Sequence, residues 1–338
     1  MKMKTTTLAL PVCLLLSSIV SLAQADNSNE KVLPEAYFKA ELSAIQFDLP
    51  AYKDGFGVVD LAPVSGAYFS KGEKQDGEAI TLTGGAITDY AINAVDGLLF
   101  FEGSSFYSQS DESYSELLGS DGAGNRIRFA LFDGSDGYNS SSANPLHYQL
   151  KSDLEYFGAN LAVGIANQAF GWNMRYQVGP QFLWLNQDYK LYGSSPTDAS
   201  SRYNRHETLD TNYFGLRMGI TAEHAISEKM NFEGGLGLAA LRMNTDYNAS
   251  DARLAGGGSS LSRSLNEDTY GADLKLALRY AFTPSVELGL NFGLSYLDKT
   301  PEIIHATGAT GNGSFVPARL DTDQVLVKQT GIEFKTVF

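Results

Sequence analysis

Apolar and polar residues alternate one by one through two adjoining segments, residues 270–282 and 286–297. In each segment every second residue is apolar or aromatic, and the intervening positions hold charges, glycine and small polar residues. A period of two predicts β-strands, and the three-residue break at 283–285 predicts a hairpin turn. The charged positions of the first segment are Asp273, Lys275 and Arg279.

The length of this hairpin favours a membrane-spanning interpretation over a soluble sheet. Each segment exceeds ten residues, whereas strands of soluble proteins are usually about 5–6 residues long. At about 3.3 Å per residue, a tilted strand of this length covers roughly 25–30 Å, similar to the apolar band of an outer-membrane barrel. We therefore expect lipid on the leucine face and water on the charged face.

The same alternation, with interruptions, predicts strands along most of the chain. Short breaks at 166–169, 227–229 and 283–285 are typical of tight turns, whereas 188–210, 248–267 and 299–324 are rich in Ser, Gly, Asp, Asn and Thr and are predicted to be long loops. Short turns on one side and long loops on the other are typical of outer-membrane barrels. The predicted strands are 37–49, 56–69, 78–92, 98–107, 126–132, 146–165, 170–187, 213–226, 230–247, 270–282, 286–297 and 325–338.

These strands predict an all-β fold, a transmembrane antiparallel up-and-down β-barrel. An even strand number returns both ends to the same side of the membrane. Accepting 78–92 and 126–132 together gives about twelve strands, the favoured count, and rejecting both gives ten, the alternative.

The first 25 residues are typical of a cleaved secretory signal peptide. Lys2 and Lys4 precede the apolar run 8–20, and Ala23-Gln24-Ala25 matches a cleavage site. Residues 26–35 form a polar periplasmic lead-in, and the barrel comprises 36–338. Cleavage would remove two lysines and no acidic residue, so the net charge of −14 becomes −16, which does not favour nucleic-acid binding. Cys13 is the single cysteine and leaves with the signal, so we expect no thiolate metal site and no cofactor.

Several motifs in residues 145–338 resemble the Legionella-type major outer-membrane protein family, a porin-like group. They are Asp153-Leu154-Glu155, Gly179-Pro180-Gln181-Phe182-Leu183-Trp184, Gln187-Asp188-Tyr189, Phe214-Gly215-Leu216-Arg217 and the C-terminal segment ending in Phe338. The resemblance implies an outer-membrane barrel with a pore and surface exposure. Phe338, with Phe334 in phase, resembles the signal read by the barrel-assembly machinery.

Charged residues in the polar phase are the candidate site, because this phase should face the lumen. A hairpin turn at 227–229 would place Glu223 directly opposite Glu233, and Arg175 or Arg279 could compensate the two like charges. The belt of charges either forms a constriction that filters solutes or plugs the barrel with salt bridges. The lumen candidates are Arg175, Arg217, Glu223, Glu233, Asp273, Lys275, Arg279, Glu287, Glu333 and Lys335, and the aromatic girdle candidates are Trp172, Trp184, Tyr270, Tyr280, Phe282 and Tyr296.

No constellation in the sequence points to catalysis. The histidines are His147, His206, His224 and His305, and none has a spacing typical of a hydrolase triad. We therefore expect no enzyme but a porin-like channel for small polar solutes in the outer membrane of a Gram-negative bacterium. Its expected partners are outer-membrane lipid, lipopolysaccharide and the barrel-assembly machinery. The alternative is a surface-exposed adhesin or structural barrel with a plugged lumen that presents extracellular loops.

Overall fold

The computed structural model describes residues 35–59, 62–72, 74–92, 97–118, 126–130, 132, 136–140, 145–169, 171–195, 202–253, 258–305, 307–308, 315–316 and 318–338. The expected signal peptide and nearly all of the expected lead-in lie outside these residues. Among the described residues, no helix is long and apolar enough to cross a membrane.

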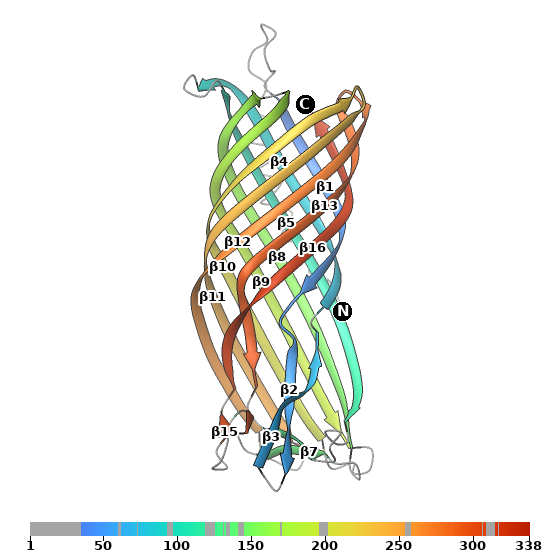
Figure 1. Cartoon of the computed structure of the whole chain (residues 1–338), viewed down its shortest axis with the longest axis vertical. Coiled ribbons are helices and arrows are strands. Elements are labelled where there is room, and N and C mark those ends of the chain that lie inside the picture. The colour runs from blue at the N-terminus through green and yellow to red at the C-terminus, as the bar shows by residue number, and fades with distance from the viewer. Residues whose placement is uncertain are drawn as a thin grey trace.

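Ten strands form one closed antiparallel barrel in which β1 and β16 pair to complete the ring (Figure 1). The all-β up-and-down barrel is therefore confirmed. Its ring contains ten strands, the alternative count, but segment 78–92, which that count rejected, is in the ring, and segment 56–69, which it accepted, is not. The strands are β1 (Ala36–Asp48), β4 (Lys74–Ile92), β5 (Gly97–Leu118), β8 (Leu146–Ala169), β9 (Trp172–Ser194), β10 (Arg202–Ser227), β11 (Met230–Arg253), β12 (Gly258–Thr283), β13 (Val286–Ile304) and β16 (Arg319–Val337).

The two expected strands that do not join the ring lie in a separate four-stranded sheet. Segment 56–69 falls on β2 (Tyr52–Val59) and β3 (Ala62–Lys71), and segment 126–132 falls on β6 (Arg126–Ala130), which pairs with β7 (Asp136–Ser140). β6 has five residues and spans only about 17 Å, which is too short to cross the apolar band of a membrane. A further pair, β14 (Thr307–Gly308) and β15 (Phe315–Val316), also lies outside the ring.

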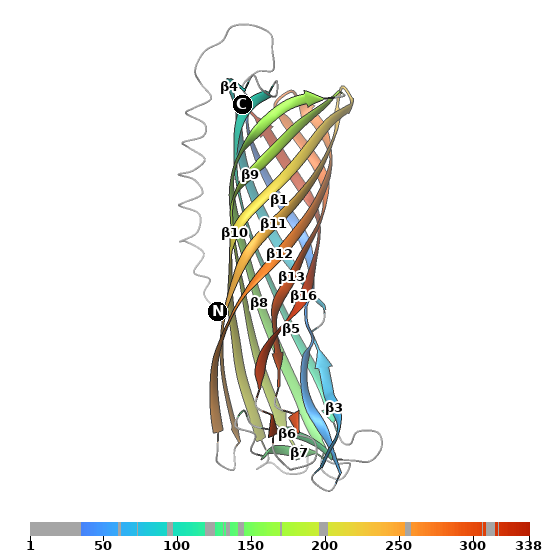
Figure 2. The same ribbon diagram turned by 60° about the vertical axis from the view of Figure 1, so that its left-hand side comes forward.

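The barrel has two different ends. The turns Glu228-Lys229 and Pro284-Ser285 lie at one end, together with the C-terminus, and this end is called the turn end. The four-stranded sheet lies at the opposite end, called the loop end (Figures 1 and 2). The turn expected at 166–169 is displaced, because Ala169 still pairs with Trp172. Gly171 in this turn has φ +80°, a left-handed conformation that favours glycine.

The three expected long loops are mostly strand. Most of 188–210 belongs to β9 and β10, most of 248–267 to β11 and β12, and much of 299–324 to β13 and β16. Tyr203, expected on a loop, points inward and is fully buried. The strands therefore continue well beyond the apolar band toward the loop end, and the sequence expectation for these segments was wrong.

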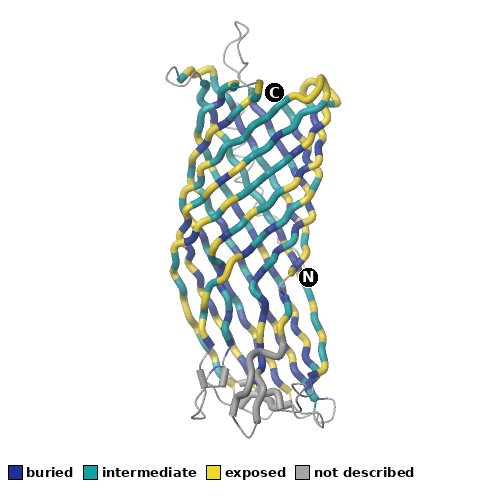
Figure 3. The backbone as a smooth tube through the Cα atoms, viewed as in Figure 1, coloured by how far each residue is buried: buried dark blue, intermediate teal, exposed yellow. Residues whose placement is uncertain are grey.

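Buried and exposed positions alternate along much of the barrel wall (Figure 3). Near the turn end the outward positions are large apolar residues exposed on the outer surface of the barrel, and the inward positions are charged or small. This is the arrangement expected for strands in lipid. The exposed apolar residues include Leu42, Phe214, Leu216, Met218, Leu236, Leu238, Leu290, Phe292, Ile332 and Phe334.

Candidate functional site

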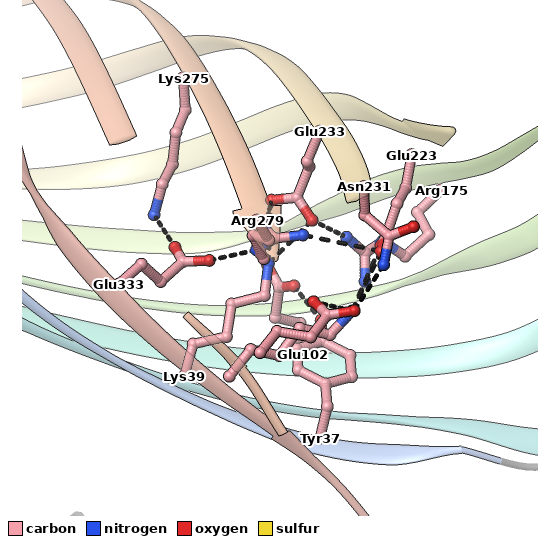
Figure 4. Close-up of polar contacts among 12 residues, drawn as sticks. Tyr37, Lys39, Glu102, Arg175, Glu223, Asn231, Glu233, Lys275, Arg279 and Glu333 are labelled. Carbon is pink, nitrogen blue, oxygen red and sulfur yellow. Dashed lines mark hydrogen bonds and ion pairs between the residues drawn. The ribbon is translucent and has the colours of Figure 1, made fainter. Parts of the chain in front are cut away.

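The expected lumen residues come together inside the barrel near the turn end. They come from β9, β10, β11, β12, β13 and β16, and all take part in hydrogen bonds or ion pairs with one another or with residues of β1. Figure 4 shows those around Glu233 and Arg279. These charged residues are called the ion-pair layer. Its members are Lys39, Glu41, Glu102, Arg175, Arg217, Glu223, Glu233, Asp273, Lys275, Arg279, Glu287, Glu333 and Lys335.

Glu233 on β11 is the centre of the ion-pair layer. Its carboxylate lies 2.8 Å from Lys39 Nζ, 2.9 Å from Arg175 and 2.9 Å from Arg279. Its residue is 5% exposed, so three cations from three different strands meet one buried carboxylate. A buried carboxylate is stable only when it is well paired, and this one crosslinks β1, β9, β11 and β12.

Arg279 is the most deeply buried cation of the layer, at 1% exposure. Its Nε donates to Glu333 at 2.6 Å, and its two terminal nitrogens lie 3.6 Å from Glu223 and 2.9 Å from Glu233. Lys275 continues the network with contacts of 3.1 Å to Glu333 and 2.8 Å to Glu41. The guanidinium thus joins β16, which lies two strands from β12 in one direction, to β10, which lies two strands away in the other.

The cross-strand pair of glutamates lies where the sequence predicts it, with Glu223 directly opposite Glu233. Both arginines named as possible partners contact Glu233, and Arg279 also contacts Glu223. Lys335 adds a contact of 3.1 Å to Glu223. The turn itself differs from the expectation: Ser227 pairs with Met230, and an irregularity between Ala225 and Ser227 restores the expected register.

Three residues of this region were not nominated from the sequence. Lys39 and Glu41 lie on β1, where the polar phase of the strand already marked them as inward. Glu102 on β5 accepts a hydrogen bond from the hydroxyl of Tyr37, whose ring also lies under the Arg175 guanidinium at 5.3 Å. Alternation in β1 could have identified the first two, whereas Glu102 follows an apolar run that obscures its phase.

Arg217 and Asp273 form a separate bidentate pair nearer the middle of the barrel. Arg217 Nε donates to one carboxylate oxygen at 2.9 Å, and a terminal nitrogen donates to the other at 2.7 Å. This parallel geometry is the strongest common form of a charge pair. It also uses the charge of both residues, leaving neither free for a passing ion.

An apolar layer fills the barrel next to the ion-pair layer on its loop-end side. On β10, for example, the inward residues run from Glu223 through Arg217 to Tyr213, which is fully buried. The buried members of the apolar layer are Ile45, Phe47, Leu49, Ala79, Leu154, Tyr156, Leu183, Leu185, Tyr213, Leu241, Met243, Leu297, Val325 and Val327.

A third group closes the loop end, and Glu207 on β10 is its centre. Glu207 accepts hydrogen bonds from the hydroxyls of Tyr52 and Tyr247, and both carboxylate oxygens lie 2.9 Å from His305 Nε2. His305 Nδ1 lies 2.5 Å from the Lys53 carbonyl oxygen. Tyr52 and Lys53 belong to β2, so the four-stranded sheet is tied to the barrel wall by this group, called the loop-end cluster.

A second contact of β2 reinforces the loop-end cluster. Asp54 accepts from Arg205 at 2.8 Å and from the Tyr148 hydroxyl at 2.9 Å. The Arg205 guanidinium lies over the Phe132 ring at 4.5 Å and 3.6 Å from Asp251. Arg205 and Asp54 are 1% and 2% exposed in their side chains, so their pairing offsets the cost of removing both charges from water.

The loop-end cluster shifts the ionisation of its own members. Burial disfavours the charged form of Glu207, but His305, Arg205 and Tyr247 outweigh burial and lower the pKa of this carboxyl to about 2. Burial likewise disfavours protonated His305, but the Glu207 carboxylate outweighs it and raises the pKa of the imidazole. Burial and the same carboxylate raise the pKa of Tyr52. Both ring nitrogens of His305 face oxygen atoms, of Lys53 and of Glu207, an arrangement that favours the protonated imidazole beside the carboxylate.

The remaining expected residues lie on the outer surface or the end of the barrel. The ring of the girdle residue Trp172 stacks on the His224 ring near the turn end, with 4.7 Å between the ring centroids. Farther along the wall, Trp184 Nε1 donates to Asp210 Oδ1 at 3.1 Å. Tyr270, Tyr280 and Phe282 are exposed, and the Tyr296 hydroxyl bonds Gln324 at 3.2 Å. Phe334 and Phe338 are exposed, and the backbone N–H of Phe338 donates to Ala36 at 2.9 Å.

The histidines outside the loop-end cluster lie on the barrel exterior. His206 Nε2 lies 3.0 Å from Asp188 Oδ1. His147 Nε2 lies 2.8 Å from Ser115 Oγ, a pair that sequence spacing did not reveal. Among the described residues no carboxylate orients His147, and no group of three acidic, histidine or cysteine side chains could hold a metal ion.

Comparisons with known proteins identify no family for this chain. No family model and no curated protein matches it. The solved structures that it resembles include the outer membrane protease OmpT of Escherichia coli, at 10% identity with a TM-score of 0.41 over 93% of this chain and 99% of that one. Another is a major outer membrane protein of Thermus thermophilus, at 12% identity and a TM-score of 0.30 over 88% and 98%. Likeness at this level carries nothing about activity or ligand.

Proposed function

We propose that this protein is an adhesin-like or structural outer-membrane β-barrel with a closed lumen. Its loop-end half stands outside the cell and presents the extracellular loops. The closed ring and the band of outward apolar residues near the turn end support a membrane location, because a closed barrel leaves no backbone group unpaired in lipid. The aromatic girdle and the terminal Phe338 support the bacterial outer membrane and assembly by its dedicated machinery.

The observation that carries the proposal is the filling of the lumen at three successive levels. The ion-pair layer, the apolar layer and the loop-end cluster each contain side chains from strands around the ring, most of them under 10% exposed. This arrangement favours the plugged barrel over the porin-like channel, since a permeating solute would have to disrupt buried ion pairs and a packed apolar layer.

Conductance in a planar lipid bilayer tests the closed lumen. We expect the purified, refolded protein to produce no steady open-pore steps in salt solution at neutral pH, in a membrane where a general porin gives ohmic steps. Stable ohmic conductance from the wild-type barrel would overturn the proposal and restore the porin-like channel for small polar solutes.

Epitope labelling tests which half faces outward. A tag inserted in the connection 254–257, between β11 and β12, should be labelled by antibody on intact cells. The matched control is the same tag at Glu228-Lys229, which should be labelled only after the outer membrane is disrupted. The reverse pattern would show that the turn end is outside.

A further inference from the structure

A cavity of about 250 Å³ lies inside the barrel between the ion-pair layer and the apolar layer. Its wall is polar toward the turn end and around its sides, and apolar toward the loop end. Because liquid water takes about 30 Å³ per molecule, this space equals about eight waters or one small solute. The polar wall includes Thr81, Thr83, Asn160, Gln181, Asn291 and Gln329, and Phe106 and Tyr156 form part of the apolar wall.

Glycines keep this cavity open where a side chain would fit. Gly235 and Gly293 both line it, and an added Cβ would meet its nearest neighbours at only 3.5 Å, an ordinary contact distance. By contrast, a Cβ at Gly331 would collide with the Leu42 backbone oxygen at 2.3 Å. Backbone crowding thus explains Gly331 but does not explain Gly235 or Gly293, whose missing side chains leave room in the cavity.

Unpartnered amide groups line the same space. Asn291 is 4% exposed, and neither its amide nitrogen nor its amide oxygen has a hydrogen-bond partner among the described residues. The Gln181 oxygen likewise has no partner there. Buried polar groups without partners are rare in native proteins and indicate a bound molecule or water. An amide offers a donor and an acceptor, which together suit a hydroxyl group.

The charges around the cavity exclude a charged ligand. Arg217 is paired with Asp273, Lys275 with Glu41 and Lys39 with Glu233, at 2.7–2.8 Å in each case. The charged residues that line the cavity are four cations and four carboxylates, so a charged ligand would meet no excess of opposite charge to offset its loss of hydration. A neutral molecule that exchanges hydroxyl hydrogen bonds and rests on Phe106 and Tyr156 meets no such cost.

We infer that this cavity is a binding site for one small, neutral, hydroxyl-rich solute of about monosaccharide size. The ligand would supply partners for Asn291 and Gln181 and fill the space that Gly235 and Gly293 leave open. The inference stands apart from the closed lumen, because a barrel can hold an internal ligand whether or not it conducts.

Retention of a labelled sugar during refolding tests this site. The full-length mature barrel is refolded into detergent with radiolabelled D-glucose, passed rapidly through a desalting column, and counted per folded barrel. Folding around the probe avoids the need for it to pass the closed layers. Gly235→Val, which places a side chain in the cavity, should lower the retained label at least about tenfold, equivalent to about 1.4 kcal/mol.

The adjacent glycine gives the matched control. Gly234 lies on the outer face of the same strand, and an added Cβ there would also meet its neighbours at ordinary distances, the nearest at 3.6 Å. Gly234→Val should therefore retain as much glucose as the wild type. Gly293→Val is the second cavity variant if Gly235→Val fails to give a heat-modifiable folded band, and it should lose label in the same way.

Two results would overturn the inference. Equal retention by the wild type and the cavity variants would mean that the cavity holds water alone. Equal retention of radiolabelled glutamate and glucose by the wild type would mean entrapment without recognition of a neutral solute. Glucose retained by the wild type and by Gly234→Val, but not by the cavity variants, supports the site.

Discussion

The two halves of the barrel are built from the same strands with opposite polarity. On β10 the outward residues near the turn end are Phe214, Leu216 and Met218, whereas the outward residues near the loop end are polar, from Asn204 to Asn212. The inward residues change in the opposite sense, from Glu223 and Arg217 to Tyr213, Leu209 and Tyr203. Side chains point alternately outward and inward along the whole strand. Part-way along it, the outward residues change from apolar to polar and the inward residues become more apolar and aromatic.

This change marks the boundary between two solvents. Near the turn end the outside is apolar and the inside is ionic, as lipid requires. Near the loop end the outside is polar, and the inside is an aromatic and apolar core that encloses the paired charges of the loop-end cluster. One strand therefore has apolar residues outside in one half and polar residues outside in the other. The position where the outward residues change from apolar to polar marks the edge of the membrane.

The largest expected change in the free energy of unfolding comes from removing a charged residue of the ion-pair layer, inside the membrane half. Arg279→Leu removes one cation from the buried carboxylates of Glu233 and Glu333 and from the partly buried Glu223, and we expect it to lower the free energy of unfolding by about 3–5 kcal/mol, because removing one partner from a buried charge network is costly. Arg242 is the control, because it pairs with Asp268 on the exposed outer surface and its loss should cost about 0–1 kcal/mol. Urea unfolding in lipid vesicles measures both, and equal effects would show that the ion-pair layer is solvated.

A slightly smaller change in the free energy of unfolding is expected from placing a charge on the outer surface of the membrane half, compared with the outer surface of the loop-end half. Leu276 and Ser264 lie on the same face of β12, in the membrane half and the loop-end half. Leu276→Arg should lower the free energy of unfolding by about 2–4 kcal/mol if it lies near the bilayer midplane, whereas Ser264→Arg should change it by about 0.5 kcal/mol or less. The same vesicle assay measures both variants, and a costly Ser264→Arg would move the membrane edge toward the loop end.

The sequence predicted the membrane half well because its two faces contrast strongly. Apolar and charged residues alternate in β12, so register, inward charges and the Glu223–Glu233 pair could all be read directly. In the loop-end half, outward Asn204 and Thr208 alternate with inward Arg205 and Glu207, and polar residues on both faces give no contrast. These segments therefore read as loops although they form strands.

The loop-end cluster could not be predicted for a different reason. His305 and Glu207 are 98 positions apart and meet only through the closure of the ring and the placement of β2. No local pattern marks either residue as buried. The apolar layer was missed because its members, such as Leu183 and Val327, occupy the phase expected to face water.

The smallest expected effect is the pH dependence of the loop-end half. The raised pKa of His305 means that the histidinium contributes stability in full below its ordinary value of about 6.5, and this stability is lost as the pH rises through the raised value. The lowered pKa of Glu207, about 2, means that its contribution is present above its ordinary value and is lost as the pH falls toward 2. The loop-end half should therefore be most stable between these limits.

His305→Gln isolates the histidine contribution. We expect it to cost about 1.5–3 kcal/mol near neutral pH, as for a hydrogen bond to a charged group, and to abolish the alkaline loss of stability. Protease cleavage within β2 and β3, followed against pH, measures this region separately from the membrane half. The same alkaline loss in the variant would assign it to another group.

The joint between β1 and β16 has a consequence for how the chain reaches its native state. Lys39 on β1 binds Glu233, which lies 194 positions later in the chain, and β1 pairs with both β4 and the last strand. Contacts of such long sequence separation form slowly. The first strand therefore takes its place in the ring only when the last strand is available, and until then Glu233 lacks its contact with Lys39. Insertion should consequently proceed as one late, cooperative step, with the incomplete chain dependent on a holding factor until the ring closes.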